Sequence, residues 1–338
     1  MVIKNKFKTY QNTKSIKNMV IKMINVYVKG RLGNQMFQYA AARGIQERYY
    51  PNELINMNFK YVVKDGKKKQ ETGWNNQLTG FNLNKSVKFD KKVKLNIDQI
   101  ILLIFYFVTF KVIKLFSKDC NYYSNKKKLE SKIQKFYNKK GLYLYSYGYY
   151  DFKFSKRKNK LMIGYFESDK YFNNIKEKLT YEFSYKLKKL DKNENIYKNA
   201  LEKNSVCISI RRGDFLTTNN AYDCVVCDIQ YFEKALVEIE KKLKDYNLII
   251  FSDDIDWVKK NMFFETKNIV FEKGNDNVYE KLRMMSMCNN FIISNSTFSW
   301  WAQYLSKNKR KIVIGPSKWR NTNISLYNDI YEKDWILI

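Results

Sequence analysis

Three short polar clusters carry side chains that suit phosphate binding, and each cluster follows a short apolar run. Arg211 and Arg212 follow VCISI, residues 252–254 follow NLIIF, and residues 295–297 follow FIIS. A guanidinium stays charged and binds two phosphate oxygens through its planar fork, so two adjacent arginines suit a diphosphate. An ion pair with Asp214 is the structural alternative, although two arginines exceed what one carboxylate needs. The pattern favours a ligand site.

The other two clusters are consistent with more than one role. Residues 253–256 contain a D-x-D pattern, which marks a divalent-metal site in many nucleotide-sugar enzymes. The same residues open a predicted helix, where Asp254 and Asp256 would cap backbone N–H groups, and capping is the favoured role. Residues 295–297 offer hydroxyls and N–H groups at another helix start. They would cradle a phosphate or act as an ordinary cap, and both roles stay open.

A glycine-containing turn near the N-terminus is a further candidate. The apolar run 24–28 predicts a strand, and residues 36–49 follow with apolar side chains at helical spacing. Between them lies the turn KGRLGNQ, which contains Gly33, Asn34 and Gln35. Glycine lets a backbone approach a ligand closely, so the turn suits a phosphate or a sugar. Two glycines are equally consistent with a tight strand-to-helix turn.

The elements that would position these clusters alternate regularly along the second half of the chain. Strands are predicted at 206–210, 248–251, 268–271, 291–294 and 311–314, and helices near 229–244, 254–263, 278–288 and 298–306. Such alternation predicts a parallel, doubly wound sheet, which binds ligands outside the carboxyl ends of its strands. A strand at 161–166 joins the one at 24–28 in a second unit. The expected fold is α/β, with two Rossmann-like domains, 23–200 and 201–338, and a cleft between them.

Charge and cysteine content restrict the class of protein. The 338 residues carry a formal net charge of +30, which invites a nucleic-acid or an anionic-membrane partner. The lysines are spread through every segment, which favours a general composition bias over a nucleic-acid-binding module. Five cysteines, an odd number, predict free thiols and a cytoplasmic location. The pair Cys224 and Cys227 has no second pair to complete a zinc site, so a packing role is favoured.

Two segments have separate interpretations. Residues 1–22 are basic and lack the apolar core of a signal peptide, so they are interpreted as an N-terminal extension. The run 100–110, IILLIFYFVTF, would span about 16 Å as a helix, whereas a bilayer core is about 30 Å thick. A buried helix is the favoured interpretation. Contact with a membrane surface comes second, and a true span is third.

Six motifs occur in an order that points to a known family. They are GRLGNQMFQYA, GYFESDKYF, SIRRGDF, CDIQYF, FSDD and MSMCNNFIISNSTFSWW. Together they resemble the α-1,2-fucosyltransferases of glycosyltransferase family 11, over residues 23–48, 162–175 and 205–320. Six motifs in order are far more specific than any one of them.

The resemblance implies a GT-B-like fold and an activity. It implies transfer of fucose from GDP-fucose to the 2-hydroxyl of a galactose in a surface glycan, with inversion and without a metal or other cofactor. The first domain would hold the galactose-terminated acceptor and the second the GDP-sugar. The expected partners are this donor and this glycan, with no nucleic acid. Peripheral contact with the inner face of an anionic membrane is kept as an alternative.

The resemblance also assigns roles to residues. Arg211 and Arg212 would hold the diphosphate and stabilise the leaving GDP. Asp214 is assigned to the catalytic residues together with them. The donor site would comprise Gly33, Asn34 and Gln35 from the glycine turn, and Asp253, Glu280, Asn295, Ser296 and Thr297 from the second domain. Glu280 or Asp276 would lie near the guanine, because Lys281 stands where many members carry aspartate.

The general base is left open. An inverting transfer removes a proton from the acceptor hydroxyl, and the chain has no histidine. Ser209 replaces a histidine that is frequent in the family, and Glu167 stands where glutamine is common. The candidates are Asp214, Glu167 and Asp223, with the donor phosphate as an alternative, and Asp214 is expected to be mainly structural.

Overall fold

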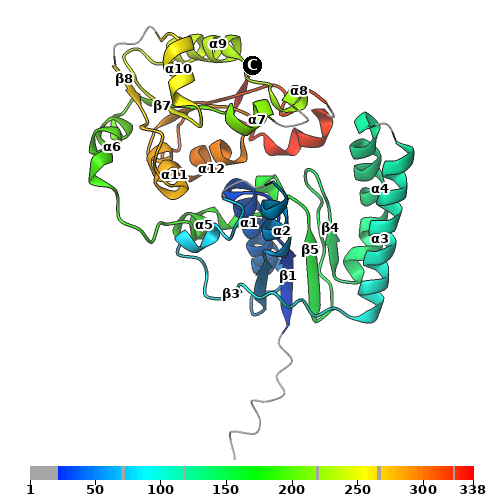
Figure 1. Cartoon of the computed structure of the whole chain (residues 1–338). Coiled ribbons are helices and arrows are strands. Elements are labelled where there is room, and N and C mark those ends of the chain that lie inside the picture. Colours follow the sequence, from blue (N-terminus) through cyan, green and yellow to red (C-terminus); the bar gives the residue numbers. More distant parts are fainter. Residues whose placement is uncertain (1–21, 70–72, 118, 218–220, 265–267, 323) are drawn as a thin grey trace, which may run out of the picture.

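The chain folds around two parallel sheets whose strand ends face each other (Figure 1). This computed structural model describes residues 22–338 except 70–72, 118, 218–220, 265–267 and 323. The interpretation of residues 1–22 as an extension therefore falls almost entirely outside the described residues. Two Rossmann-like sheets on either side of a cleft are the GT-B-like arrangement expected from the sequence.

The first sheet has the strand order β3-β2-β1-β5-β4. Its strands are β1 (Met23–Tyr27), β2 (Leu54–Asn58), β3 (Val87–Lys88), β4 (Leu142–Leu144) and β5 (Asn159–Ile163). The predicted strands at 24–28 and 161–166 are confirmed as β1 and β5, which pair directly with each other. Helix α1 (Leu32–Tyr49) follows β1 and confirms the helix predicted there. Helices α2 (Lys60–Lys69) and α5 (Lys176–Glu182) complete this half with the hairpin described next.

A long helical hairpin lies on the outer side of the first sheet. It consists of α3 (Ile97–Phe116) and α4 (Asp119–Lys139), at the right of Figure 1. Leu103, Tyr106 and Phe110 of α3 pack with Leu142 of β4 and Leu161 of β5 in a separate apolar cluster. The expectation of a buried helix at 100–110 is wrong, because only 22% of the apolar window of α3 is buried. The rest of its surface faces outward.

The second sheet has the order β11-β10-β9-β6-β7-β8. Its strands are β6 (Ser205–Ile210), β7 (Asn247–Ser252), β8 (Asn268–Phe271), β9 (Asn290–Ile293), β10 (Val313–Gly315) and β11 (Ile336–Leu337). In chain order this is 3-2-1-4-5-6, the order of a dinucleotide-binding sheet. The five predicted strands are confirmed within one or two residues, and β11 is additional. The first sheet ends at Ile163 and the second begins at Ser205, while the domain boundary near residue 200 stays a prediction.

Helices cover the second sheet much as the apolar spacing predicted. They are α6 (Glu194–Leu201), α7 (Gly213–Thr217), α8 (Ala221–Cys224), α9 (Ile229–Glu240), α10 (Ile255–Asn261), α11 (Val278–Ser286) and α12 (Thr297–Leu305). The last four correspond to the four predicted helices. Helix α12 differs from the others in that it packs against α1 of the first half. It therefore joins the two halves.

An aromatic cluster forms the centre of this junction. Phe37 of α1 contacts Trp300 and Trp301 of α12 at ring-centroid distances of 4.5 and 5.1 Å. Phe172 stacks on Trp301, and Tyr304 stacks on Trp300. All five rings are essentially inaccessible to solvent. Because aromatic side chains bury large apolar areas, this cluster is a strong constraint on how the two halves sit.

A backbone contact beside the aromatic cluster requires a glycine. The indole Nε1 of Trp301 donates to the carbonyl oxygen of Gly33 at 3.0 Å. A Cβ at Gly33 would lie 2.5 Å from Thr297 Oγ1 and 2.7 Å from the backbone nitrogen of Phe298. The first turns of α1 and α12 therefore approach more closely than a side chain at Gly33 would permit.

Replacing Gly33 with alanine is expected to lower the free energy of unfolding by about 1–3 kcal/mol, because the added methyl overpacks this contact. The measurement is denaturant unfolding of both proteins. The matched control is Asn34→Ala, which removes a hydrogen bond to Thr297 at the same contact but adds no atom, and should cost about 1 kcal/mol. An unchanged or increased stability of Gly33→Ala, which helix propensity alone would give, contradicts the close approach.

Candidate functional site

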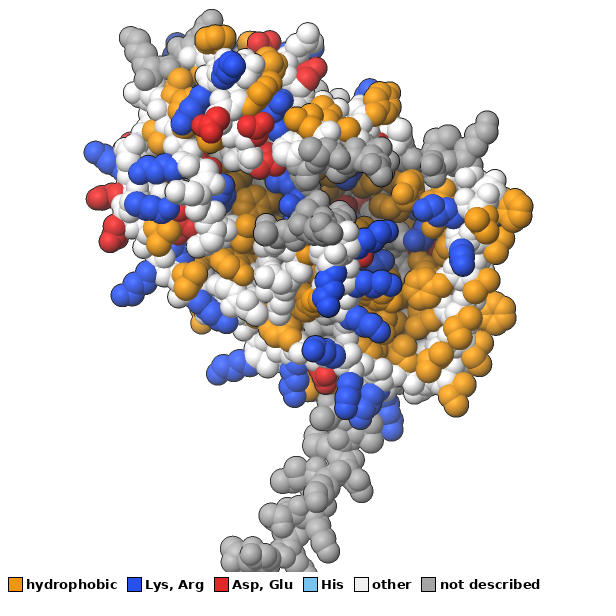
Figure 2. Space-filling view, in the orientation of Figure 1, with side chains coloured by type: hydrophobic (Ala, Val, Ile, Leu, Met, Phe, Trp, Pro, Cys, Tyr) orange, Lys and Arg blue, Asp and Glu red, His pale blue; other side chains and the backbone are white. Residues whose placement is uncertain are grey.

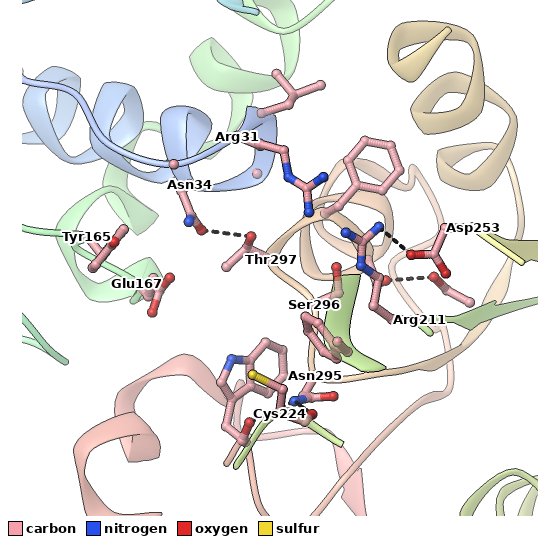
Figure 3. A pocket seen from close by; sticks show the side chains of 18 of the residues that line it. Arg31, Asn34, Tyr165, Glu167, Arg211, Cys224, Asp253, Asn295, Ser296 and Thr297 are labelled. Atoms are coloured by element: carbon pink, nitrogen blue, oxygen red, sulfur yellow. Dashed lines mark hydrogen bonds and ion pairs between the residues drawn. The ribbon is translucent and has the colours of Figure 1, made fainter. Parts of the chain in front are cut away.

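A cavity of about 660 Å³ lies between the two halves. This volume is in the range of small-molecule and cofactor sites. Its walls come from the loops that follow β1, β5, β6, β7 and β9, together with residues after β10 and a part of α4. Figure 3 shows the cavity with the side chains of both halves pointing into it.

The strand order explains why the cavity lies here. In each sheet the chain changes direction of winding beside its first strand, between β1 and β5 and between β6 and β9. Open α/β sheets bind ligands outside the carboxyl ends of their strands at such switch points. The residues after β1 and β5 face those after β6 and β9 across the cavity. Two switch points thus meet at one site.

Arg211 lies in the cavity wall, at the end of β6. Its Nη1 forms an ion pair with Asp253 Oδ2 at 2.9 Å, and the side chain is a quarter exposed (Figure 3). Asp253 also accepts a hydrogen bond from the backbone nitrogen of Arg212 at 2.8 Å. A Cβ at Gly213 would lie 2.7 Å from Asp253 Oδ2, so the glycine of the RRGD motif makes room for this carboxylate. Asp253 holds Arg211 in place.

Arg212 points elsewhere, which corrects the expectation of a pair at the diphosphate. Its guanidinium carbon lies 3.2 Å from the ring centroid of Trp257, and its Nε contacts Asp254 Oδ2 at 3.4 Å. It lines a smaller neighbouring pocket rather than the large cavity. Asp254 stands at the N-cap of α10 but pairs with Arg212 instead of making a capping bond within the described residues. Two successive side chains leaving a strand end diverge, and here only one faces the cavity.

The glycine turn after β1 forms the opposite wall. Gly30 has a φ of +75°, a left-handed conformation that glycine adopts without strain. Asn34 Oδ1 accepts a hydrogen bond from Thr297 Oγ1 at 2.9 Å (Figure 3). Both residues were expected to contact a ligand, and here their side chains bind each other across the cavity. Gly33 lines the cavity and also makes the contact with α12. Gln35 is fully buried and bonds the Gly30 carbonyl, the Asn75 carbonyl and the Gln77 nitrogen, which is a structural role.

The loop after β9 presents the start of α12 to the cavity. Ser296 is the N-cap residue of α12, and together with Thr297, Phe298 and Ser299 it lines the cavity. N–H groups at a helix start favour anions. Asn295 lies in the same loop, but its Nδ2 donates to the carbonyl oxygens of Cys224 at 2.9 Å and Trp319 at 3.0 Å. The Asn295 amide therefore ties neighbouring loops together.

The structure also corrects the expectation for Glu280. It is almost fully buried, accepts hydrogen bonds from Tyr197 and the Leu190 nitrogen, and pairs with Arg283 at 2.8 Å. It is not among the residues that line the cavity in the described part of the chain. Asp276, the other carboxylate expected near the guanine, does line the cavity, and its Oδ1 pairs with Lys192 at 2.7 Å.

Glu167 lies across the cavity from Arg211, after β5 (Figure 3). Burial raises the pKa of its carboxyl to about 7, although the positive charge of Arg320 opposes the rise. Arg320, in the loop after β10, also lines the cavity and contacts the Cys224 sulfur. Sequence reasoning missed Arg320, yet it lies in a loop that follows a strand, as the recognised clusters do. That position was the available signal.

The other two base candidates are placed differently. Asp223 lines the cavity, but its Oδ1 accepts hydrogen bonds from the nitrogen and the hydroxyl of Thr322 at 2.7 and 2.6 Å. The side chain of Asp214 lies outside the described residues. In the described residues no cluster of three or more His, Cys, Asp or Glu side chains could hold a metal ion. The four described cysteines are free, and Cys224 and Cys227 pack beside the cavity loops.

Tyrosines from both halves line one end of the cavity. Tyr147 contacts Tyr123 of α4 at 5.8 Å and Tyr327 at 5.6 Å between ring centroids, and Tyr165 lies beside Glu167. Two of them come from the stretch 55–160, in which the sequence showed no recognisable motif. Arg31, quoted only as part of the glycine turn, also reaches into the cavity (Figure 3).

Comparison with known proteins identifies the relatives of this chain. A family model described as glycosyl transferase family 11 matches residues 23–338. The O-antigen biosynthesis glycosyltransferase WbnK of Escherichia coli is 29% identical over 86% of this chain and 93% of its own length. An alpha-1,2-colitosyltransferase of Escherichia coli is 28% identical over 91% and 96%. The mouse galactoside 2-alpha-L-fucosyltransferase Sec1 is 29% identical over 30% of this chain and 28% of its own length.

Solved structures give more distant matches. The fucosyltransferase NodZ from Bradyrhizobium aligns with a TM-score of 0.48 and 10% identity, over 87% of this chain and 96% of that chain. The ADP-heptose LPS heptosyltransferase II of E. coli aligns with a TM-score of 0.39 and 10% identity, over 94% and 90%.

Proposed function

The chain belongs to glycosyltransferase family 11, and from that membership we propose that it transfers fucose from GDP-fucose to the 2-hydroxyl of a galactose in a surface glycan. The observation that carries the proposal is the cavity between two switch points, with Arg211 fixed on one side and Glu167 on the other. One relative is an alpha-1,2-colitosyltransferase. Colitose is therefore the second candidate for the transferred sugar.

We place the donor diphosphate between Arg211 and the start of α12. Arg211 is held by Asp253, so its guanidinium keeps a fixed position. The hydroxyls and N–H groups of Ser296 and Thr297 lie beside it in the cavity wall. Negative charge grows on the β-phosphate as GDP leaves, and a fixed cation stabilises charge best where it develops. In this proposal Arg211 takes the role expected of a pair, and no metal is required.

The positions of Arg211 and Glu167 suit inversion. In a single displacement the acceptor oxygen bonds to the anomeric carbon on the face opposite the breaking bond to the β-phosphate. A base for the acceptor proton must then lie on the side away from the diphosphate. Glu167 lies on that side (Figure 3), and a pKa near 7 lets its carboxylate accept a proton at neutral pH. We therefore propose Glu167 as the general base.

Product analysis tests the overall proposal. The protein is incubated with GDP-fucose, or with the corresponding GDP-activated colitose, and a panel of galactosides. The expected product carries fucose on the 2-hydroxyl of galactose with inverted anomeric configuration, formed equally well after chelation of divalent metals. Preference for colitose would assign the second sugar, whereas transfer to another hydroxyl or dependence on a metal would refute the finer assignment.

Binding of GDP should separate the two neighbouring arginines. At a GDP concentration about 100 times the dissociation constant, the wild-type protein should gain about 2.7 kcal/mol of stability. Arg211→Ala should lose this gain, because the diphosphate loses its cation. Arg212→Ala is the matched control and should keep most of it, since Arg212 packs on Trp257 outside the cavity. Thermal unfolding with and without GDP measures both, and equal losses would contradict the placement of the diphosphate.

The rate of transfer should depend on Glu167 and on pH. A base with a raised pKa is active when deprotonated, so kcat/KM should rise with pH through about 7. Glu167→Gln should lower kcat by a factor of about 10²–10⁴ and abolish this rise, while GDP binding is retained. Asp223→Asn, whose amide oxygen still accepts from Thr322, is the control and should keep the wild-type pH profile. A Glu167→Gln enzyme with the wild-type rate and profile would instead favour the donor phosphate as base.

A further inference from the structure

The outward face of α3 is an apolar surface of unusual extent. Ten large apolar side chains along it are exposed: Ile97, Ile100, Ile101, Ile104, Phe105, Phe107, Val108, Val112, Leu115 and Phe116. Figure 2 shows apolar side chains gathered over the α3–α4 hairpin, with Lys and Arg side chains along the edge of the patch. Soluble monomers rarely expose contiguous apolar patches of this kind unless something binds there.

The geometry of α3 shows that this surface is one face of the helix. At 100° per residue, the exposed apolar positions occupy about half of the helix circumference. The four buried residues, Gln99, Leu103, Tyr106 and Phe110, recur at spacings of three and four on the opposite side. One side of α3 thus belongs to the core of the first half, and the other has no covering element among the described residues.

The contacts of α3 argue against a membrane-spanning position. Gln99 Nε2 donates to the carbonyl oxygens of Lys140 at 2.8 Å and Asn159 at 3.0 Å. The Tyr106 hydroxyl donates to Glu130, which also binds the nitrogen and hydroxyl of Ser146. Although α3 is long and apolar enough to cross a bilayer, crossing would strip these polar groups of their partners. A helix fixed in this way would lie along a surface.

The charged side chains of the hairpin indicate what kind of surface α3 would lie on. Lys128, Lys132, Lys135 and Lys139 recur on the exposed face of α4, and Lys111 and Lys114 are exposed near the end of α3. The described carboxylates of the hairpin are internal or paired, since Glu130 is buried and Asp98 binds Arg157 and Lys140. A basic and apolar face of this kind attracts anionic lipid headgroups, at about 1 kcal/mol for each nearby lysine.

From these observations we propose that the α3–α4 hairpin docks the protein on an anionic lipid bilayer. The apolar face of α3 enters the boundary between headgroups and acyl chains, and the lysines of the hairpin contact the headgroups. A second copy of the chain fits the surface less well, because two such faces would bring lysines together with no exposed carboxylate of the described hairpin between them. This proposal does not depend on the sugar that is transferred.

The hairpin also connects this surface to the cavity. Tyr123 of α4 lines the cavity, and Lys127 Nζ donates to the carbonyl oxygen of Leu326 in the second half at 3.4 Å. Docking therefore places the tyrosine-lined end of the cavity beside the membrane. A glycan attached to that membrane would approach the cavity from this end.

Vesicle sedimentation with the full chain, in the absence of donor, tests the proposal. The protein should sediment with mixed phosphatidylcholine–phosphatidylglycerol vesicles and much less with phosphatidylcholine alone, and added salt should release it. The double substitution Ile104→Glu with Val108→Glu should weaken binding roughly tenfold or more, since both side chains are more than half exposed in the free protein. Lys132→Gln with Lys135→Gln should weaken binding to anionic vesicles several-fold.

Matched controls keep the result interpretable. Leu201→Glu with Val237→Glu changes two exposed apolar residues away from the hairpin and should leave vesicle binding unchanged. An unchanged thermal unfolding midpoint shows that each variant is folded. The proposal is overturned if the wild type ignores anionic vesicles or if the α3 variant binds like the wild type. It is also overturned if light scattering shows a dimer that only the α3 substitutions dissociate, because the surface then binds a second copy.

Discussion

The close approach of two helix starts, those of α1 and α12, is the contact on which the rest of this structure depends. Gly33 leaves the space, Trp301 donates to its carbonyl oxygen, and Thr297 binds Asn34. Each helix follows the first or fourth strand of its sheet, so the contact also brings the two switch points together. The aromatic cluster around Phe37 excludes water behind it. The two halves touch at this contact and are separated next to it, and the space between them is the cavity.

Within that cavity most charged groups already have partners. Arg211 is paired with Asp253, Asp276 with Lys192, and Asp223 receives two hydrogen bonds from Thr322. Such pairing fixes each group before a ligand arrives, which is the condition under which a charge stabilises a transition state well. Glu167 differs, because burial raises its pKa into the neutral range. A carboxyl group whose pKa lies near neutral pH is suited to exchange a proton.

Helix α3 of the hairpin is buried on one side and exposed on the other. The inner side of α3 completes the core over β4 and β5, and its polar residues bind the backbone there. Its outer side remains apolar, and α4 extends from that surface to the cavity wall at Tyr123. The same hairpin therefore links the exposed apolar surface to the wall of the cavity. The exposed lysines of the hairpin contribute to the overall charge of +30.

Sequence by itself determined the parts that depend on local periodicity. Apolar runs and helical spacing placed β1, α1, the strands from β6 to β10 and the helices from α9 to α12, because neighbouring residues decide which backbone conformation buries an apolar side. The polar clusters at strand ends followed from the same alternation. Motifs in order supplied the family, which the match over residues 23–338 confirmed.

Tertiary structure alone decided which of these side chains face the cavity. Arg211 and Arg212 are adjacent in sequence and equal in chemistry, yet Trp257 and Asp254 hold one of them outside. Glu280 is sealed by Arg283 and Tyr197, whereas Glu167 and Arg320 meet in the cavity from loops 153 residues apart in the chain. The apolar run of α3 could be buried or exposed until its neighbours were known. The burial and the pairing of a side chain depend on residues that are distant in sequence. A local sequence pattern therefore does not predict them.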